Sequence, residues 1–186
     1  EYFAARVLAR RPDSGLVHSE WHADRMVPAL DEVIAALAPS EALPGPPRTG
    51  WEEPTQLAAA MAGDASAFVR GVSEVNLPLA AAIAAEGAVG SRLPRSLVDG
   101  LRLALVERSH APEGDPRDRI ACGMALGQLG DPRYERRDGP HGPYLWPQWI
   151  DVPAGTYPIG ADDPIDWTWE RTAESGGGFW ATLRHA

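Results

Sequence analysis

Apolar side chains recur every three or four positions through most of residues 1–134, and this spacing predicts a series of helices. The clearest stretch runs from Asp115 to Tyr134. Asp115 is suited to accept a bond from a free backbone N–H at a helix start, and Pro116 suits the first helical position. Gly130 and Pro132 end the helix. Its apolar stripe is expected to consist of Ile120, Ala121, Met124 and Ala125.

Six further helices are predicted before this one, giving about seven in all. The first covers residues 1–10, with Phe3 and Val7 as an apolar pair one turn apart. The other five are expected to begin near Asp24, Trp51, Asp64, Asn76 and Pro94. Their apolar faces include Phe68, Val69, Val72, Leu79, Ile83, Leu97, Val98, Leu101 and Leu105.

Proline residues determine where two of these helices can begin. Residues 18–37 carry a strong amphipathic pattern, which Pro28 permits only if the helix begins near Asp24, so that the proline lies in the first turn. Thr49 and Glu52 have the spacing of a capping box. Pro54 favours a start two or three residues later instead.

Short connections between helices favour antiparallel neighbours. We therefore expect an all-α fold, an irregular antiparallel helical array of the HEAT-like kind over residues 1–134, with its handedness undetermined. No exact internal repeat is visible.

The helical pattern stops near residue 135. Five of the seven tryptophans lie in the last 41 residues: Trp146, Trp149, Trp167, Trp169 and Trp180. We expect a linker at 135–148 and an irregular tail at 149–186. The tail is predicted to contain one or two short strands, at Trp149–Val152 and Thr156–Gly160.

Charge and composition restrict the partners. All 17 basic residues are arginine, the net charge is −9 and the pI is about 5.0. An acidic chain is a poor ligand for nucleic acid or an anionic membrane, so protein partners are expected. One cysteine excludes an intrachain disulfide, and no apolar run reaches the roughly 18–20 residues of a membrane span. These features favour a cytoplasmic location.

Two candidate sites lie within the helical part. His18 and His22 have the i, i+4 spacing of metal ligands on a helix, but no third ligand lies nearby, so we interpret them as a solvated helix start. Cys122 lies in the clearest helix, and we interpret it as a small buried apolar residue rather than a nucleophile.

Two further candidates lie in the tail. Asp162, Asp163 and Asp166 are interpreted as a surface turn rather than a calcium site, because the EF-hand spacing is absent. Gly176–Gly178 lacks the frame of a phosphate-binding loop. The tail tryptophans are expected to belong to a larger core. We therefore predict no catalytic, cofactor-binding or metal residue, and no cofactor.

A resemblance enters at Trp149–Gly160, WIDVPAGTYPIG. This stretch resembles the opening of the formylglycine-generating, sulfatase-modifying factor family, which starts with an apolar strand, Pro-Ala-Gly, an aromatic residue and a glycine. The helix DPRDRIACGMALGQLGDPR is similar to the segment before such domains in bacterial NACHT/STAND-type signalling NTPases. Residues 1–6 resemble the end of a helix found just after the NTPase core in those proteins, and residues 51–72 resemble part of their helical arm.

The resemblance covers about residues 1–170 and implies a helical arm between an upstream nucleotide switch and a downstream formylglycine-generating-type domain. The chain is then expected to be a piece of a longer protein. The family's cysteines and metal ligands lie beyond its opening strands, so Cys122 does not match them. The family continues after Trp169-Glu170-Arg171 with proline and histidine, whereas this chain continues TAESGGG.

Three functions are therefore considered. The first is a non-catalytic scaffold or relay within a bacterial signalling NTPase, such as one that acts in defence, which contacts proteins or other domains of the same chain. The second is the N-terminal part of a formylglycine-generating-type protein-modifying oxidase. The third is a self-standing helical protein-binding module.

Overall fold

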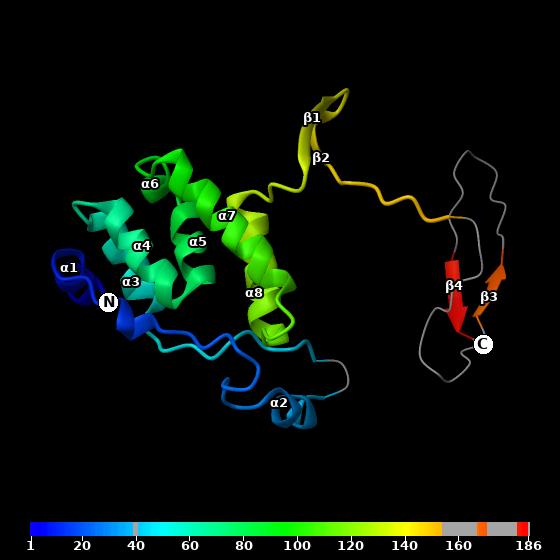
Figure 1. Ribbon diagram of the computed structural model, residues 1–186, viewed down its shortest axis with the longest axis horizontal. Helices are drawn as coiled ribbons and strands as arrows, with labels where there is room; N and C mark the ends of the chain where they lie inside the picture. The colour runs from blue at the N-terminus through cyan, green and yellow to red at the C-terminus, as the bar shows by residue number, and fades with distance from the viewer. Residues whose placement is uncertain (39–40, 154–166, 171–181, 186) are drawn as a thin grey trace. The chain divides into compact units, whose positions relative to one another are not determined.

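The computed structural model describes residues 1–38, 41–153, 167–170 and 182–185 (Figure 1). The chain divides into two compact units, Glu1–Gln148 and Trp149–Ala186. The described part of the first unit is mostly helical. Its helices are α1 (Tyr2–Arg10), the 3-10 helix η1 (Ser14–Val17), α2 (Leu30–Ala36), α3 (Glu52–Met61), α4 (Ala65–Val75), α5 (Leu77–Ala85), α6 (Gly87–Gly90), α7 (Arg95–His110) and α8 (Pro116–Leu129).

Polar side chains set the helix starts that the sequence predicted. The carboxylate of Asp64 accepts a bond from Ala67 N–H at 2.9 Å, and the side chain of Asn76 accepts one from Leu79 N–H at 3.0 Å. Asp115 caps α8 with Pro116 in its first turn, and Gly130 ends that helix at φ 92°. α3 begins at Glu52 rather than Thr49, as Pro54 indicated. These caps satisfy backbone groups that helix ends leave free.

The apolar core of the first unit is built around α5. This helix packs against α3, α4, α6, α7 and α8, while α1 packs against α3. Its side chains Leu79 and Ile83 are buried, as predicted, together with Ala80, Ala81 and Ala84. The predicted faces of α4 and α7 also enter the core, through Phe68, Val69, Val72, Leu101 and Leu105. Small alanines let the helices approach closely around a few larger side chains.

The predicted apolar stripe of α8 is wrong in part. Ala125 is buried as predicted, but Ile120 and Met124 are 51% and 67% exposed, and the core instead receives Cys122, Leu126 and Leu129. α8 carries apolar residues on both sides, so the pattern alone does not choose the buried side.

The same error occurs in α1. Phe3 and Val7 are 79% and 62% exposed, whereas Ala5 and Leu8 are buried. Here the two larger apolar residues of the predicted pair lie outside the core, and the smaller Ala5 enters it.

The predicted helix over 24–37 is also wrong in extent. Only Leu30–Ala36 is helical, and none of the residues of α2 is buried. The preceding segment is irregular because its backbone bonds elsewhere: Ala23 N–H donates to Glu113 O at 3.0 Å, and Trp21 O accepts from Asp115 N–H at 2.8 Å. The Val27–Pro28 peptide bond is cis. Tertiary hydrogen bonds therefore override the helical pattern of this segment.

The range 135–148, predicted as a linker, contains a hairpin. β1 (Glu135–Gly139) pairs antiparallel with β2 (Gly142–Trp146), with Gly139 opposite Gly142. The Arg137 guanidinium lies 4.4 Å from the centre of the Trp146 ring. Gly142 has φ 109°, a conformation that glycine adopts easily. The turn is Pro140-His141, and the Gly139-Pro140 pair is a turn signal that the helix-based interpretation overlooked.

The second unit contains an antiparallel pair, β3 (Trp167–Glu170) and β4 (Thr182–His185). The strand predicted at Trp149–Val152 is wrong, because these residues have no regular structure. The strand predicted at Thr156–Gly160 lies outside the described residues. No helix in the described part of the chain is long and apolar enough to cross a membrane.

Candidate functional site

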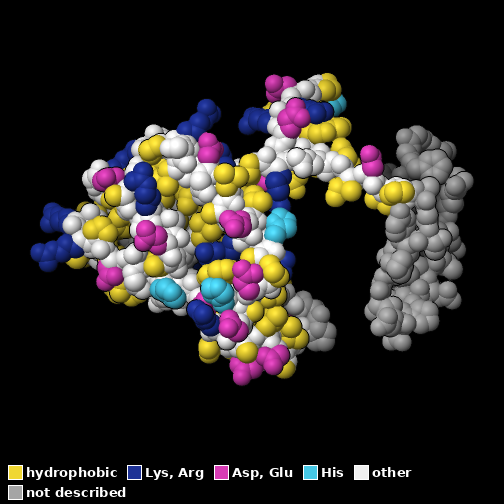
Figure 2. Space-filling view, in the orientation of Figure 1, with side chains coloured by type: hydrophobic (Ala, Val, Ile, Leu, Met, Phe, Trp, Pro, Cys, Tyr) yellow, Lys and Arg dark blue, Asp and Glu magenta, His cyan; other side chains and the backbone are white. Residues whose placement is uncertain are grey.

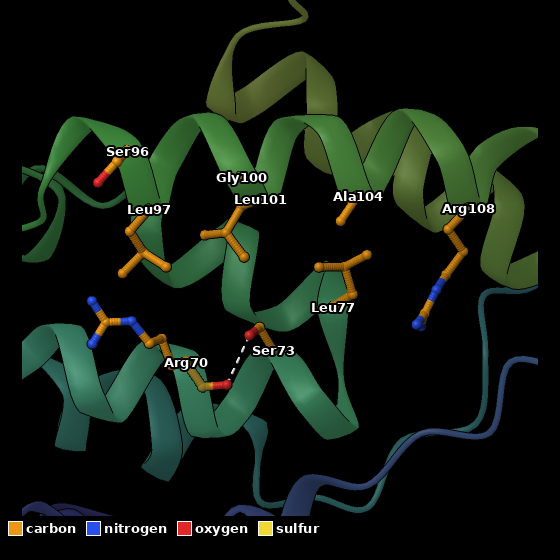
Figure 3. Close-up of a pocket in the computed structure, with 9 residues that line it drawn as sticks. All are labelled: Arg70, Ser73, Leu77, Ser96, Leu97, Gly100, Leu101, Ala104 and Arg108. Atoms are coloured by element: carbon orange, nitrogen blue, oxygen red, sulfur yellow. Dashed lines mark hydrogen bonds between the residues drawn. The ribbon is translucent and has the colours of Figure 1, made fainter.

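A groove lies between α4 and α7 (Figure 3). Both helices pack against α5, which leaves a space of about 400 Å³ between them. The close-up shows Leu77, Leu97 and Leu101 pointing into this space. Nine residues line it: Arg70, Ser73, Leu77, Ser96, Leu97, Gly100, Leu101, Ala104 and Arg108.

Small residues keep this groove open. Ser96, Gly100 and Ala104 lie on one side of α7, and their short side chains leave room above the leucines. Across the groove, the Ser73 hydroxyl turns back and donates to the Arg70 carbonyl at 2.7 Å (Figure 3). The Ser73 hydroxyl proton is therefore already bonded within α4. Leu77 and Leu101, each only 4% exposed, form the floor of the groove, and Leu97 is half-buried beside them.

The two ends of the groove carry arginines. Figure 3 shows Arg70 near Leu97 and Arg108 beyond Ala104. Arg70 is exposed and makes no ion pair within the described residues. The Arg108 guanidinium lies 4.5 Å from the centre of the Trp21 ring. Because no carboxylate lines the described groove, it is a positively charged surface of mixed polar and apolar character on an acidic chain.

The histidine pair does not form the arrangement that a metal site on a helix would need. Residues 18–22 are not helical, so His18 and His22 do not share a helix face. His22 Nδ1 lies 3.0 Å from Glu20 Oε1, and its ring stacks on Trp21 with centres 3.8 Å apart. Within the described residues no group of three or more His, Cys, Asp or Glu side chains is placed to hold a metal. The aspartates at 162, 163 and 166 and the glycines at 176–178 lie outside those residues.

Cys122 is a buried side chain, as the sequence indicated. It is free and fully buried, and its thiol lies 3.6 Å from Asp118 Oδ2. Burial, followed by the nearby charge of Asp118, raises the pKa of the Cys122 thiol to about 12. Burial also raises the pKa of Asp118. A thiol with such a high pKa is a poor nucleophile at neutral pH.

Cys122 should therefore resist alkylation in the folded chain. We expect iodoacetamide at pH 8 to react with it about 100-fold more slowly, or slower still, in native buffer than in denaturing urea, because the thiol must first be exposed by opening of the fold. Intact-mass spectrometry over time measures the modified fraction. Equal rates in native buffer and in urea would contradict the burial of this side chain.

Sequence reasoning missed a buried ion pair at the start of α8. Arg117 and Asp115 have side chains only 1% and 0% exposed, joined by Nη2–Oδ2 and Nε–Oδ1 contacts of 2.8 and 2.9 Å. Arg117 Nη2 also donates to the Pro28 carbonyl at 2.8 Å. The Arg117 side chain holds the pKa of Asp115 below its usual value. The pair therefore fixes the irregular segment before α2 onto α8.

Glu20 stabilises the same segment in a pH-dependent way. Its carboxylate accepts bonds from His22 N–H at 3.0 Å and Trp21 N–H at 2.9 Å. The His22 backbone bond is the largest cause that lowers the pKa of Glu20 from 4.5 to about 2. The Glu20 carboxylate therefore takes up a proton more readily in the unfolded chain than in the folded one. Its contribution to the free energy of unfolding is complete above pH 4.5 and is lost as pH falls towards about 2.

The variant Glu20→Gln tests this assignment. We expect its midpoint of urea unfolding to fall less than that of the unchanged chain between about pH 5 and about pH 3, because the titrating group is gone. Glu53→Gln is the matched control, since Glu53 is an exposed carboxylate on the surface of α3. Parallel pH profiles for Glu20→Gln and the unchanged chain would contradict the assignment.

Comparisons with protein-family models, with curated proteins and with solved structures found no match for this chain.

Proposed function

We propose that this chain is a non-catalytic helical scaffold of a larger bacterial signalling NTPase, linking a nucleotide switch to a formylglycine-generating-enzyme-like domain. The observation that supports a role in protein contacts is the outward side of α8. Ile120 and Met124 are more than half exposed there, next to the exposed glycines Gly123 and Gly127. Small residues beside large apolar ones allow another backbone to approach closely.

A helix with apolar residues on both sides suits a position between two layers. α8 uses one side for the core of the first unit, through Leu126 and Leu129. Its other side is free to pack against a further layer, as each unit of a helical array packs against the next. This supports a HEAT-like arrangement for the parent protein.

α1 offers a second surface of the same kind. Phe3 and Val7 are exposed, and they line a surface recess of about 470 Å³ with Arg6, Arg10 and Arg11. Apolar side chains also lie between charged ones over the helical unit in Figure 2. Exposed apolar surface of this kind favours protein contacts. The net charge of −9 disfavours nucleic acid, so we propose protein partners and a cytoplasmic location.

The mass of the native product tests the proposal. Antibodies raised against the purified chain would capture the protein from its source, and mass spectrometry would measure the intact mass. We expect a mass well above the 20.0 kDa of this chain. The purified chain itself should not hydrolyse ATP. ATP hydrolysis by this chain that survives repurification would contradict the scaffold role.

One observation favours the self-standing binding module as a second candidate. Residues 1–148 form one compact unit with their own buried core. A native mass of 20.0 kDa would support this candidate and contradict the role within a larger NTPase.

A further inference from the structure

We propose that the α4–α7 groove of one copy of this chain binds α2 of a second copy. The inference does not depend on the parent protein proposed above. It rests on two surfaces of the same chain that match in charge and in shape. One is the groove, with its leucines and terminal arginines. The other is α2, an amphipathic helix of the opposite charge.

Among the residues that the structure describes, α2 has no partner that buries it. Its apolar positions Leu30, Val33, Ile34 and Leu37 follow the helical period, yet Ile34 is 57% exposed and the other three are only half-buried. A helix of seven residues is marginal in water without packing. A further apolar contact would therefore stabilise it.

The charges of the two surfaces are complementary. Asp31 and Glu32 are exposed in the first turn of α2. Arg70 is exposed at one end of the groove and makes no ion pair within the described part of the chain. With these charges paired, the C-terminal carbonyls of α2 point along the groove towards Arg108, and a cation there suits the negative end of a helix dipole.

The lengths also agree. Leu97 and Arg108 are eleven residues apart on α7, which corresponds to roughly 16 Å of helix. The seven residues of α2 span roughly 10 Å, so the helix fits between the two arginines. Ile34, the exposed apolar side chain of α2, then meets Leu97, since Leu77 and Leu101 are each only 4% exposed. Such a contact is small, so the association is weak and weakens further with salt.

Sedimentation equilibrium of the full chain tests this proposal. At low salt, the average mass should rise above 20.0 kDa between about 5 µM and about 500 µM. Arg70→Glu should weaken association about tenfold or more, because it sets like charges against each other. Arg136→Glu is the matched control, since Arg136 is exposed on β1 outside the groove, and it should associate like the unchanged chain.

A charge exchange makes the test specific for α2. Asp31→Arg with Glu32→Arg should weaken association as Arg70→Glu does, and combining all three substitutions should restore it. Circular dichroism checks that each variant keeps its helices. An average mass that stays at 20.0 kDa at every concentration would overturn the proposal. An equal weakening of association in Arg70→Glu and Arg136→Glu would overturn it too. Failure of the triple variant to recover would also overturn it, because another surface would then carry the contact.

Discussion

Replacing Arg117 with methionine is expected to lower the free energy of unfolding by about 3–5 kcal/mol. The substitution keeps a side chain of similar length but leaves the carboxylate of Asp115 buried at 0% exposure without its cation. It also removes the donor to the Pro28 carbonyl, so the segment before α2 loses its attachment to α8. Urea unfolding followed by circular dichroism measures the change.

The chain contains a matched control for this substitution. Asp131, Pro132 and Arg133 repeat the Asp-Pro-Arg sequence, and Arg133 contacts Asp131 in the same way, with an Nη2–Oδ2 distance of 2.6 Å. The Arg133 side chain is 40% exposed, however, while that of Asp131 is 8% exposed. Water that reaches the guanidinium weakens such a pair, so Arg133→Met should have a smaller effect than Arg117→Met. Equal effects of the two substitutions would show that burial does not determine the contribution of the pair.

The variant Ile83→Ala should lower the free energy of unfolding by about 2–5 kcal/mol. Ile83 is fully buried on α5, which packs against five other helices of the first unit. Removing its outer carbons leaves a cavity that these helices cannot fill without moving. Thermal and urea unfolding of the variant measure the loss.

Ile120→Ala is the control for Ile83→Ala. Both substitutions remove the same atoms from a helix, but Ile120 is 51% exposed on α8. Its replacement should change the free energy of unfolding by about 0.5 kcal/mol or less. If Ile120→Ala lowered the free energy of unfolding strongly and Ile83→Ala lowered it only slightly, the placement of Ile83 in the core and Ile120 on the surface would be wrong.

Local signals predicted the helix boundaries well. Asp64, Asn76 and Asp115 each cap a helix in the structure, because capping depends on a few neighbouring residues. The buried faces of α4 and α7 were also predicted, because each of these helices has one apolar side to bury, whereas α5 is apolar on all sides and lies at the centre of the core. α1 and α8 have apolar residues on two sides, and only the packing of neighbouring helices decides between them.

Non-local contacts explain the remaining differences. The segment at 18–29 has a helical pattern, but its backbone bonds to Val75, Glu113 and Asp115, which lie far away in sequence. The Arg117–Pro28 bond likewise joins residues 89 positions apart. The α4–α7 groove arises from two helices that share α5 as a support, so its arginines carried no signal in the sequence. The hairpin at 135–146 had a local turn signal, but β1 is mostly charged and lacks the apolar alternation of a half-buried strand.

Methionine oxidation of the native product most directly tests the claim that this chain works through protein contacts on α8. Met124 is 67% exposed, Met61 is 40% exposed and Met26 is 3% exposed in the chain itself. In the purified chain, dilute hydrogen peroxide should oxidise Met124 fastest and Met26 slowest. In the native product, we predict that Met124 is protected about tenfold or more, because another layer covers it, while Met26 remains slow. Equal oxidation of Met124 in both samples would contradict the claim.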